Sequence, residues 1–396
     1  MDIGDSPSEA AFRSEARAWL QQHAPAVTAL DVSDLPKRLA AVTAWQQTLL
    51  RGGWAGLTWP RRYGGRDASP IEALIFQEEE ARLIDWPTFK YPMNVPLNLA
   101  APAIMDFGTD ELRALHLPRI LRGEEFWCQM FSEPGAGSDL AALSTRAVRD
   151  GSVFRVTGQK VWTSYAHLAH YGLLLARTNP DVPKHRGITC FIVDLSTPGV
   201  TVRPLRQLTG AHEFNEVFLD DVVIPDSNVL GEVDDGWRVA HAILSSERAY
   251  LGAVSITQTK FDRLLQLARR VGRASDPIIR QELADCYARE AILRFFGYRA
   301  RTQIANERDR GPEASLMKLA QSRHIFDAAS LATRLAGPDG ALDEPYAPWA
   351  AELLGSFGPK IGGGTDNVQL NAIAERLLGL PREDDPHRRL PWRETR

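Results

Sequence analysis

The chain has few cysteines, no excess of charge of one sign and no long apolar run. Its 396 residues include 3 cysteines, and 46 basic side chains stand against 50 acidic ones. This near balance argues against nucleic acid or an anionic membrane surface as the main partner. No apolar run approaches the ~20 residues that a membrane-spanning helix needs. The first seven residues lack the basic start and apolar core of a signal peptide. We therefore expect a soluble, cytoplasmic protein.

Cysteine and histidine are too scattered to suggest a metal centre. Cys128, Cys190 and Cys286 are odd in number and widely spaced, which is typical of reduced, buried thiols in a cytosolic protein. The histidines share no ligand spacing, and we interpret three of them as polar structural residues: His116, His167 and His170. We expect no metal ion.

The length predicts two or three domains, and residues 1–125 form the first, an all-helical one. Ser6-Pro7-Ser8-Glu9 is a capping box with proline at the first helical position, and Ser69-Pro70-Ile71-Glu72 repeats it. We expect further helical segments over about 35–50, up to about residue 84 and from about residue 109, with a proline-punctuated apolar connection over 91–103.

Residues 126–232 change to short segments rich in β-branched residues, which predicts strands over 153–164, 171–178, 187–194, 200–205 and 216–224. With no helix between them, these strands should pair as antiparallel sheet, whereas a Rossmann fold needs alternating helices. Residues 233–396 return to helices, over about 236–270, 277–308, 313–336 and 365–378, with a loop over 337–348. The sequence thus predicts an α+β chain in the order helical, sheet, helical.

The most informative turn lies within residues 125–140. Pro134 follows an apolar run, and Gly135 and Gly137 flank an alanine. Proline fixes φ, and glycine allows backbone conformations closed to other residues and a close approach to a ligand. Such a turn can cradle a phosphate. It lacks the third glycine of the dinucleotide fingerprint and the Gly-Lys-Ser/Thr of a P-loop, so an ordinary turn between strands is the alternative.

Taken together, two motifs strongly resemble the acyl-CoA dehydrogenase family of flavoproteins: Phe131-Ser132-Glu133-Pro134-Gly135-Ala136-Gly137-Ser138-Asp139 and Gly158-Gln159-Lys160-Val161-Trp162-Thr163-Ser164. The resemblance covers most of the chain. It implies an N-terminal helical domain (1–125), a middle antiparallel β-barrel or sandwich domain (126–232) and a C-terminal four-helix bundle (233–396). The implied reaction is α,β-dehydrogenation of an acyl-CoA thioester, in which a carboxylate removes the α-proton and the β-hydrogen leaves as hydride to N5 of FAD.

The resemblance also implies which residues bind FAD: Phe131, Ser132, Trp162, Thr163, Ser164, Thr365 and Asn367. The two serines match positions that hydrogen-bond the isoalloxazine, and Trp162 matches a residue that lies against the ring. The last pair begins the final helix, whose N-terminus suits phosphate. Without the resemblance, Trp162 could equally be a core aromatic and the serines ordinary strand residues.

Two residues match substrate-binding positions. Ser138 matches the position that contacts the CoA side of the ligand, although it could instead cap the turn that follows it. Arg248 resembles the family arginine near the substrate and the base, with a structural ion pair as the competing interpretation.

The catalytic base departs from the commonest family pattern. Many members have a glutamate where this chain has Gly363, but a subset takes its base from a helix after the β-domain, immediately before an arginine, as Glu247 lies here. Val239, Ile243 and Glu247 share one helical stripe, so this carboxylate should be buried and its pKa raised toward that of a general base. A structural ion pair is the alternative.

Gly363 has two further implications. By resemblance, its backbone N–H would polarise the thioester oxygen. The missing side chain also widens the pocket, which suggests a bulky or branched acyl group.

The resemblance weakens at the stretch Arg273-Ala274-Ser275-Asp276, which lacks the aromatic of an Arg-x-x-Phe that reaches FAD in a neighbouring subunit. Family expectations are an electron-transfer flavoprotein as acceptor and a homo- or hetero-oligomer, a dimer or tetramer, in lipid metabolism. Two alternatives to a dehydrogenase stay open: an oxidase or flavin monooxygenase of the same fold, and a non-catalytic partner subunit.

Overall fold

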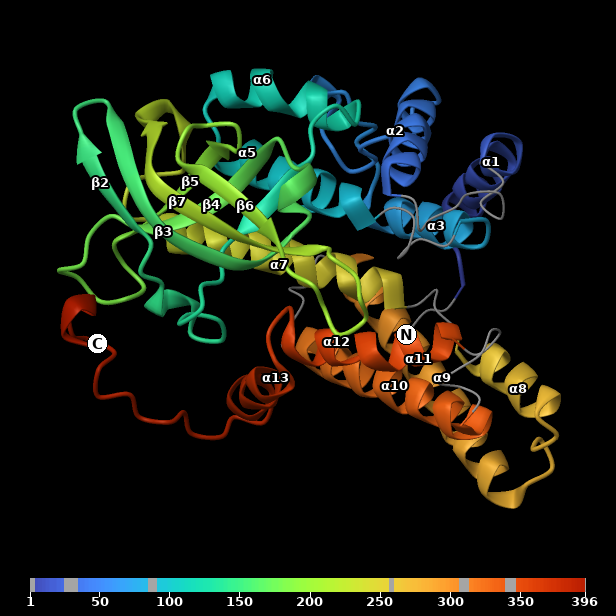
Figure 1. Ribbon diagram of the computed structural model, residues 1–396. Coiled ribbons are helices and arrows are strands. Elements are labelled where there is room, and N and C mark those ends of the chain that lie inside the picture. The colour runs from blue at the N-terminus through green and yellow to red at the C-terminus, as the bar shows by residue number, and fades with distance from the viewer. Residues whose placement is uncertain are drawn as a thin grey trace. The chain divides into compact units, whose positions relative to one another are not determined.

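The computed structural model describes residues 4–24, 35–84, 91–255, 260–305, 313–338 and 347–395. Within these ranges it leaves out the side chains of residues 91, 246–255, 301, 302, 304 and 305. The chain divides into two compact units (Figure 1). The first contains Met1–Leu20, Pro70–Arg82 and Arg248–Arg382, and the second contains Gln21–Ser69, Leu83–Glu247 and Glu383–Arg396. The N-terminal helices are therefore shared between the two units.

The first predicted helix begins where its capping box indicates. Helix α1 spans Pro7–His23. The backbone N–H of Ser6 donates to Glu9 Oε2 at 2.7 Å, and the N–H of Glu9 donates to Ser6 Oγ at 3.3 Å. Helix α3 spans Pro70–Ala81 and ends earlier than expected. Its buried Glu79 accepts hydrogen bonds from two arginines of α1, Arg13 at 3.0 Å and Arg17 at 2.7 Å.

The remaining helices of the first unit follow residue 260, and four of them build one apolar core. These remaining helices are α8 (Phe261–Arg270), α9 (Pro277–Ala305), α10 (Glu313–Ala336), α11 (Ala347–Gly355), α12 (Phe357–Ile361) and α13 (Asp366–Ala372), the last extended by a π-helical turn, Ile373–Leu377. Each of the four helices contributes buried side chains to this core: for example, Leu267 from α8, Leu283 from α9, Leu331 from α10 and Trp349 from α11. The helix expected over 236–270 is interrupted, and most of the loop expected over 337–348 lies outside the described residues.

The expectation of a connection over 91–103 was wrong, because this segment is helical. A 3-10 turn (Tyr91–Met93) leads into a π-helical turn (Val95–Ala100) and then α5 (Ala101–Phe107). Pro96 and Pro102 lie in the first turn of the π-helical segment and of α5, respectively. Helices α2 (Leu35–Arg51) and α6 (Asp110–Leu121) complete the helical part of the second unit, and α7 (Gly236–Ser255) follows its last strand.

The strands form one sheet with the order β6-β7-β3-β2-β4-β5-β8, and β1 pairs with β4. Their bounds are β1 Trp127–Met130, β2 Arg146–Asp150, β3 Val153–Ser164, β4 Tyr171–Arg177, β5 Ile188–Asp194, β6 Val200–Pro204, β7 Phe214–Pro225 and β8 Val229–Leu230. All five expected strands are present. Pairing is mostly antiparallel as expected, but β1 and β4 run parallel, because the β2–β3 hairpin lies in the crossover that joins them.

The sheet curls around its own core. Phe154 on β3 and Phe191 on β5 are separated by two strands, yet their ring centroids lie 5.0 Å apart. Neighbouring strands in a flat sheet are about 4.8 Å apart, so this contact requires strong curvature. Both rings belong to a buried cluster with Met130, Leu174 and Val217. The prediction of an α+β chain, with a strongly curved sheet between two helical parts of the sequence, is confirmed.

Candidate functional site

A buried ion pair joins the two sequence motifs. Lys160 on β3 is fully buried, and its Nζ lies 2.8 Å from Glu133 Oε1 and 3.0 Å from the carbonyl oxygen of Phe131. Glu133 also accepts hydrogen bonds from the backbone N–H groups of Ser144 (2.7 Å) and Thr145 (2.8 Å). The two charges satisfy each other in the interior, which is the condition for burying them.

The environment shifts the pKa of both partners. Burial alone would raise the pKa of Glu133, but Lys160 and the N–H donors outweigh it and hold this pKa at about 2. Burial lowers the pKa of Lys160 to about 8, against the opposing attraction of Glu133. The pair is therefore ionised near neutral pH and fixes the motifs at one place on the sheet.

The glycine turn is a tight reversal closed by Glu133 and Ala136, which exchange backbone hydrogen bonds of 3.0 and 3.1 Å. Neither Gly135 nor Gly137 has a positive φ, so the turn does not use the left-handed conformations that glycine allows. A Cβ at either position would meet nothing within 4 Å. What the glycines provide is an open backbone surface beside the exposed Ser138.

Ser138 does not cap the turn that follows it. The 3-10 turn Leu140–Ala142 has no side-chain cap, and the Ser138 hydroxyl makes no hydrogen bond within the part of the chain that the structure describes. This exposed hydroxyl is therefore accessible to a ligand.

Trp162 is not a core aromatic. It is 60% exposed, and its backbone adopts φ 60°, a left-handed conformation that is uncommon for a bulky residue. A β-bulge between Lys160 and Thr163 places it there, and its indole packs edge-on against Phe214 at 6.0 Å. An exposed aromatic held by a strained backbone is suited to packing against a flat ligand.

The neighbours of Trp162 are held from both sides. The N–H of Val161 donates to the carbonyl of Ser132 at 2.9 Å, so the first motif lies directly beside the second. Thr163 is buried, and Asn215 donates to its carbonyl at 2.9 Å. Its Oγ1 has no hydrogen-bond partner among the described residues. Ser132 and Ser164 are half-buried, and Phe131 is buried.

Gly158 has a packing role that sequence reasoning missed. A Cβ at Gly158 would lie 2.4 Å from Thr145 Oγ1 and 2.7 Å from Thr145 Cα. Since Thr145 also donates to Glu133, this close approach brings the start of the second motif against the residues that hold the first. Only the pairing of β2 with β3 shows the need for glycine here.

The predicted base lies on α7, as expected. Val239 and Ile243, which precede Glu247 by two and one helical turns, are both buried. The side chains of Glu247 and Arg248 lie outside the described residues. The exposure of Glu247, its pKa and its pairing therefore stay predictions.

The start of α13 is built on two left-handed glycines. Gly363 has φ 63° and Gly364 has φ 84°, and Gln369 Nε2 donates to their carbonyl oxygens at 3.3 and 3.2 Å. Thr365 is the N-cap of α13, since its hydroxyl accepts from the N–H of Val368 at 3.1 Å. Glycine adopts this left-handed conformation at position 363 without the cost that a side chain brings.

Polar groups converge on Asp366, the next residue of this motif. Ser322 Oγ donates to Asp366 Oδ1 at 2.6 Å, and the ammonium groups of Lys318 and Lys360 each lie 3.4 Å from the carboxylate. These partners lower the pKa of Asp366 against the opposing effect of burial. Asn367 is exposed.

Arg273 is engaged locally in the turn between α8 and α9. Its guanidinium pairs with Asp276 at 2.8 Å, and Asp276 also accepts from the N–H groups of Ile278 and Ile279 at the start of α9. The charge of Arg273 is therefore partly compensated within its own turn.

The three histidines are structural, as predicted. His116 Nδ1 lies 2.9 Å from Glu125 Oε2, His167 Nδ1 lies 2.9 Å from Asn215 Oδ1, and His170 Nδ1 accepts from the N–H of Phe126 at 3.0 Å. The three cysteines are free and buried, also as predicted.

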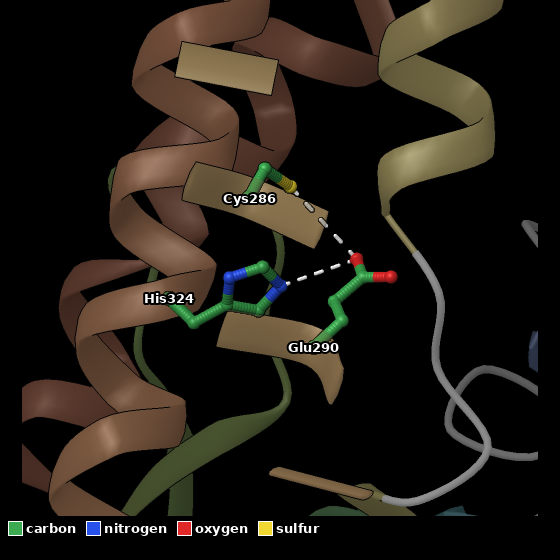
Figure 2. A group of neighbouring side chains, drawn as sticks. All are labelled: Cys286, Glu290 and His324. Carbon is green, nitrogen blue, oxygen red and sulfur yellow. Dashed lines mark hydrogen bonds and ion pairs between the residues drawn. The ribbon is translucent and has the colours of Figure 1, made fainter. Parts of the chain in front are cut away.

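One group that sequence reasoning missed could hold a metal ion. Figure 2 shows Cys286 and Glu290 on α9 facing His324 on α10. Glu290 Oε1 lies 3.3 Å from His324 Nε2 and accepts the N–H of Phe261 at 2.8 Å, at the start of α8. Burial raises the pKa of Cys286 to about 12, so this thiol is protonated near neutral pH. Glu290 caps the N-terminus of α8.

Comparison with known proteins decides the family. The chain matches the descriptions "Acyl-CoA dehydrogenase, N-terminal domain" over residues 6–124, "middle domain" over 128–222 and "C-terminal domain" over 234–378. It is 38% identical to acyl-CoA dehydrogenase IpdE1 of Mycobacterium tuberculosis over 94% of this chain and 98% of that protein. The chain belongs to the acyl-CoA dehydrogenase family. It is thus one of the oxidoreductases that act on CH–CH groups.

Two further relatives are informative for this acyl-CoA dehydrogenase. Acyl-CoA dehydrogenase FadE34 of M. tuberculosis is 42% identical over 82% of this chain, which spans 44% of that longer protein. The solved structure described as "Tcur3481-Tcur3483 steroid ACAD" superposes with a TM-score of 0.82 at 28% identity, covering 97% of this chain and 100% of that one. Among the described residues, no helix is both long and apolar enough to cross a membrane.

The family implies FAD, and the second unit offers a surface that fits such a ligand. An exposed indole stands beside half-buried serine hydroxyls, and the adjacent turn has an open backbone. Aromatic stacking and hydroxyl donors suit an isoalloxazine ring.

Proposed function

We propose that this protein catalyses α,β-dehydrogenation of a bulky acyl-CoA thioester. The observation that carries the proposal is Trp162, an exposed aromatic in a strained conformation next to the Glu133–Lys160 pair that joins the two motifs. FAD would supply the chemistry of accepting the β-hydrogen as hydride at N5. The residues of this chain bind and orient the flavin and the substrate, and they accept the α-proton.

The FAD-binding residues proposed are those of the two motifs and of the start of α13. Trp162 packs against the ring, Ser132 and Ser164 hydrogen-bond it, and Phe131 and Thr163 support it. Thr365 and Asn367 lie at the N-terminus of α13, where backbone N–H groups and the helix dipole favour phosphate. Ser138 contacts the CoA side of the substrate, a role supported by its exposed, unpaired hydroxyl.

Glu247 is the proposed base, with Arg248 beside the substrate. Support comes from the helical stripe, because Val239 and Ile243 precede it by four-residue steps and are buried. A carboxylate on such a face loses hydration, which raises its pKa toward the range of a general base at neutral pH. The backbone N–H of Gly363 polarises the thioester carbonyl, so that the α-proton becomes acidic as Glu247 removes it.

The proposed substrate is bulky because position 363 has no side chain and because the name of one solved relative indicates a bulky substrate. One solved relative is described as a steroid ACAD. We propose a polycyclic or branched acyl group in lipid metabolism. The electron acceptor proposed is an electron-transfer flavoprotein.

We propose that the protein is a cytoplasmic oligomer. The proposed boundaries between its three domains lie near residues 125 and 232. The matched family segments end at 124 and begin again at 128, and the next begins at 234. A hetero-oligomer is favoured by a further solved relative, "Crystal structure of the ChsE4-ChsE5 complex from Mycobacterium tuberculosis", with a TM-score of 0.78 and 28% identity over 97% of this chain.

The decisive test is substitution of the base. Glu247→Gln keeps size and hydrogen bonding but cannot accept the α-proton, so flavin bleaching by acyl-CoAs under nitrogen should slow by ~10²–10⁴. FAD content should be unchanged. A panel from short straight-chain to polycyclic acyl-CoAs serves both to find the substrate and to compare the variant. A rate within tenfold of the parent would exclude Glu247 as the base.

Two alternatives have distinct outcomes in the same assay. Hydrogen peroxide or a hydroxylated product without an added acceptor would indicate an oxidase or monooxygenase. A purified chain that is colourless and takes up no FAD alone would indicate a non-catalytic partner subunit, which the altered Arg273–Asp276 stretch favours.

A further inference from the structure

The C-terminal residues 383–395 return to the sheet of the second unit, where they contact the loops beside the glycine turn (Figure 1). The backbone N–H of Trp392 donates to the carbonyl of Val182 at 2.8 Å, and Pro391 forms a β-bridge with Pro183. Trp392 Nε1 lies 3.4 Å from the carbonyl oxygen of Ala142. Most residues of this segment are exposed, so Trp392 is its main anchor.

Trp392 packs against a buried arginine that holds two loops together. The guanidinium of Arg177 lies 4.9 Å from the centre of the Trp392 ring, and Arg177 is only 2% exposed. It donates to the carbonyls of Lys184 at 2.9 Å and of Ala141 at 2.6 Å. A buried guanidinium needs such acceptors, and an aromatic face adds a favourable cation–π contact.

Ion pairs continue this connection toward Ser138. Arg393 pairs with Asp181 at 2.8 Å, and Lys184 pairs with Asp139 at 2.8 Å. Asp139 directly follows Ser138 in the chain, and Ala141 lies two residues further on. The open turn is thus held on its C-terminal side by contacts that start at the C-terminal segment.

We propose that Trp392 is a positioning residue for the CoA portion of the substrate. Trp392 covers Arg177 and so maintains the hydrogen bonds of its guanidinium to the carbonyls of Ala141 and Lys184. These bonds hold the exposed turn in one conformation. A pre-organised turn binds a phosphate-bearing ligand with less loss of freedom than one that must be ordered. The inference rests on the proposed role of Ser138 and concerns binding of CoA, not removal of the α-proton.

The test compares Trp392→Ala and Trp392→Phe with Arg389→Ala in the flavin-loaded protein. Arg389 belongs to the same exposed segment, and its side chain makes no hydrogen bond, ion pair or ring contact within the described residues. Binding of CoA itself, measured by calorimetry, does not depend on the acyl group or on turnover. Trp392→Ala should weaken CoA binding about tenfold, because it removes both the cation–π contact and a hydrogen bond. Trp392→Phe keeps the aromatic face and should weaken it about threefold.

A purely structural role would give a different result. In that case, Trp392→Ala would lower the unfolding midpoint or the FAD content while CoA affinity per folded protein stayed unchanged, and the proposal would be wrong. With a working substrate, KM should rise and kcat should stay within about twofold, since no reacting atom is touched.

If Trp392→Ala does not fold, Trp392→Phe in the full chain decides the proposal. Parental CoA affinity in this variant would overturn it. Failure of the parent protein to bind CoA at all would instead contradict the proposed function.

Discussion

Lys160 and Glu133 illustrate how one ion pair at the residue scale can define a site. Each charge would be costly to bury alone, and removal of one partner from such a pair typically costs about 3–5 kcal/mol. Because Lys160 also donates to Phe131 and Glu133 also accepts from Ser144 and Thr145, the pair fixes three backbone segments at once. The residues that follow, Pro134 to Ser138, then project from a rigid base.

The pH dependence of stability tests this pair. The folded-state pKa of Glu133, about 2, lies below its ordinary value of 4.5, so its stabilising contribution is present above pH 4.5 and is lost as the pH falls toward 2. The full contribution corresponds to about 3 kcal/mol. The difference in free energy of unfolding between parent and Glu133→Gln, measured by urea titration, should therefore shrink as the pH falls from 5.5 to 3. A difference that is constant over this range would contradict the assignment.

Trp162 tests ligand binding without disturbing the core. Since the side chain is mostly exposed, Trp162→Ala should change the free energy of unfolding of the FAD-free protein by less than about 0.5 kcal/mol. The loss of ring packing should weaken FAD binding by about three- to tenfold, measured by flavin fluorescence during dilution. The matched control is Val148→Ala, another exposed apolar residue of the same sheet, which should leave FAD affinity unchanged.

At the scale of elements, the capping residues determine where a helix begins. The Ser6–Glu9 box predicted the start of α1 because its two hydrogen bonds are local and need no tertiary partner. The segment 91–103, which was expected to be a connection, was misjudged for the opposite reason. Its prolines suggested a connection. Only the tertiary structure shows that short helical turns between the prolines bury the side chains of Val95, Leu99 and Ile104.

Helix α13 provides an element-scale prediction. Thr365→Ala removes the N-cap and should lower the stability of the protein by about 1 kcal/mol, whereas Thr365→Ser should retain it. Asn367→Ala, two residues on and exposed, should change stability by less than about 0.5 kcal/mol. Thermal unfolding of the three variants measures this order of stabilities, in which Thr365→Ala is the least stable. Equal losses for Thr365→Ala and Asn367→Ala would mean that the cap is not what stabilises this helix.

At the scale of the whole molecule, we expect stability that is independent of metal ions. Within the Cys286–Glu290–His324 cluster, Glu290 already caps α8. Extended treatment with a chelator should therefore leave the unfolding midpoint and FAD content unchanged. Glu290→Ala should lower the midpoint, because it exposes the first N–H groups of α8. Release of one metal ion per chain with loss of stability would show that the cluster is a structural metal site.

The sequence by itself determined the helical, sheet, helical order of the chain, the starts of α1 and α3 and the two motifs, because caps, apolar periodicity and turn residues act over a few neighbouring positions. Tertiary structure alone decided which motif residues are buried and which are presented. Glu133 and Lys160 point inward and Trp162 points out because strand pairing and a bulge set the side on which each lies. The approach of Gly158 to Thr145 and the docking of Trp392 on Arg177 join residues far apart in the chain, and no local pattern encodes such contacts.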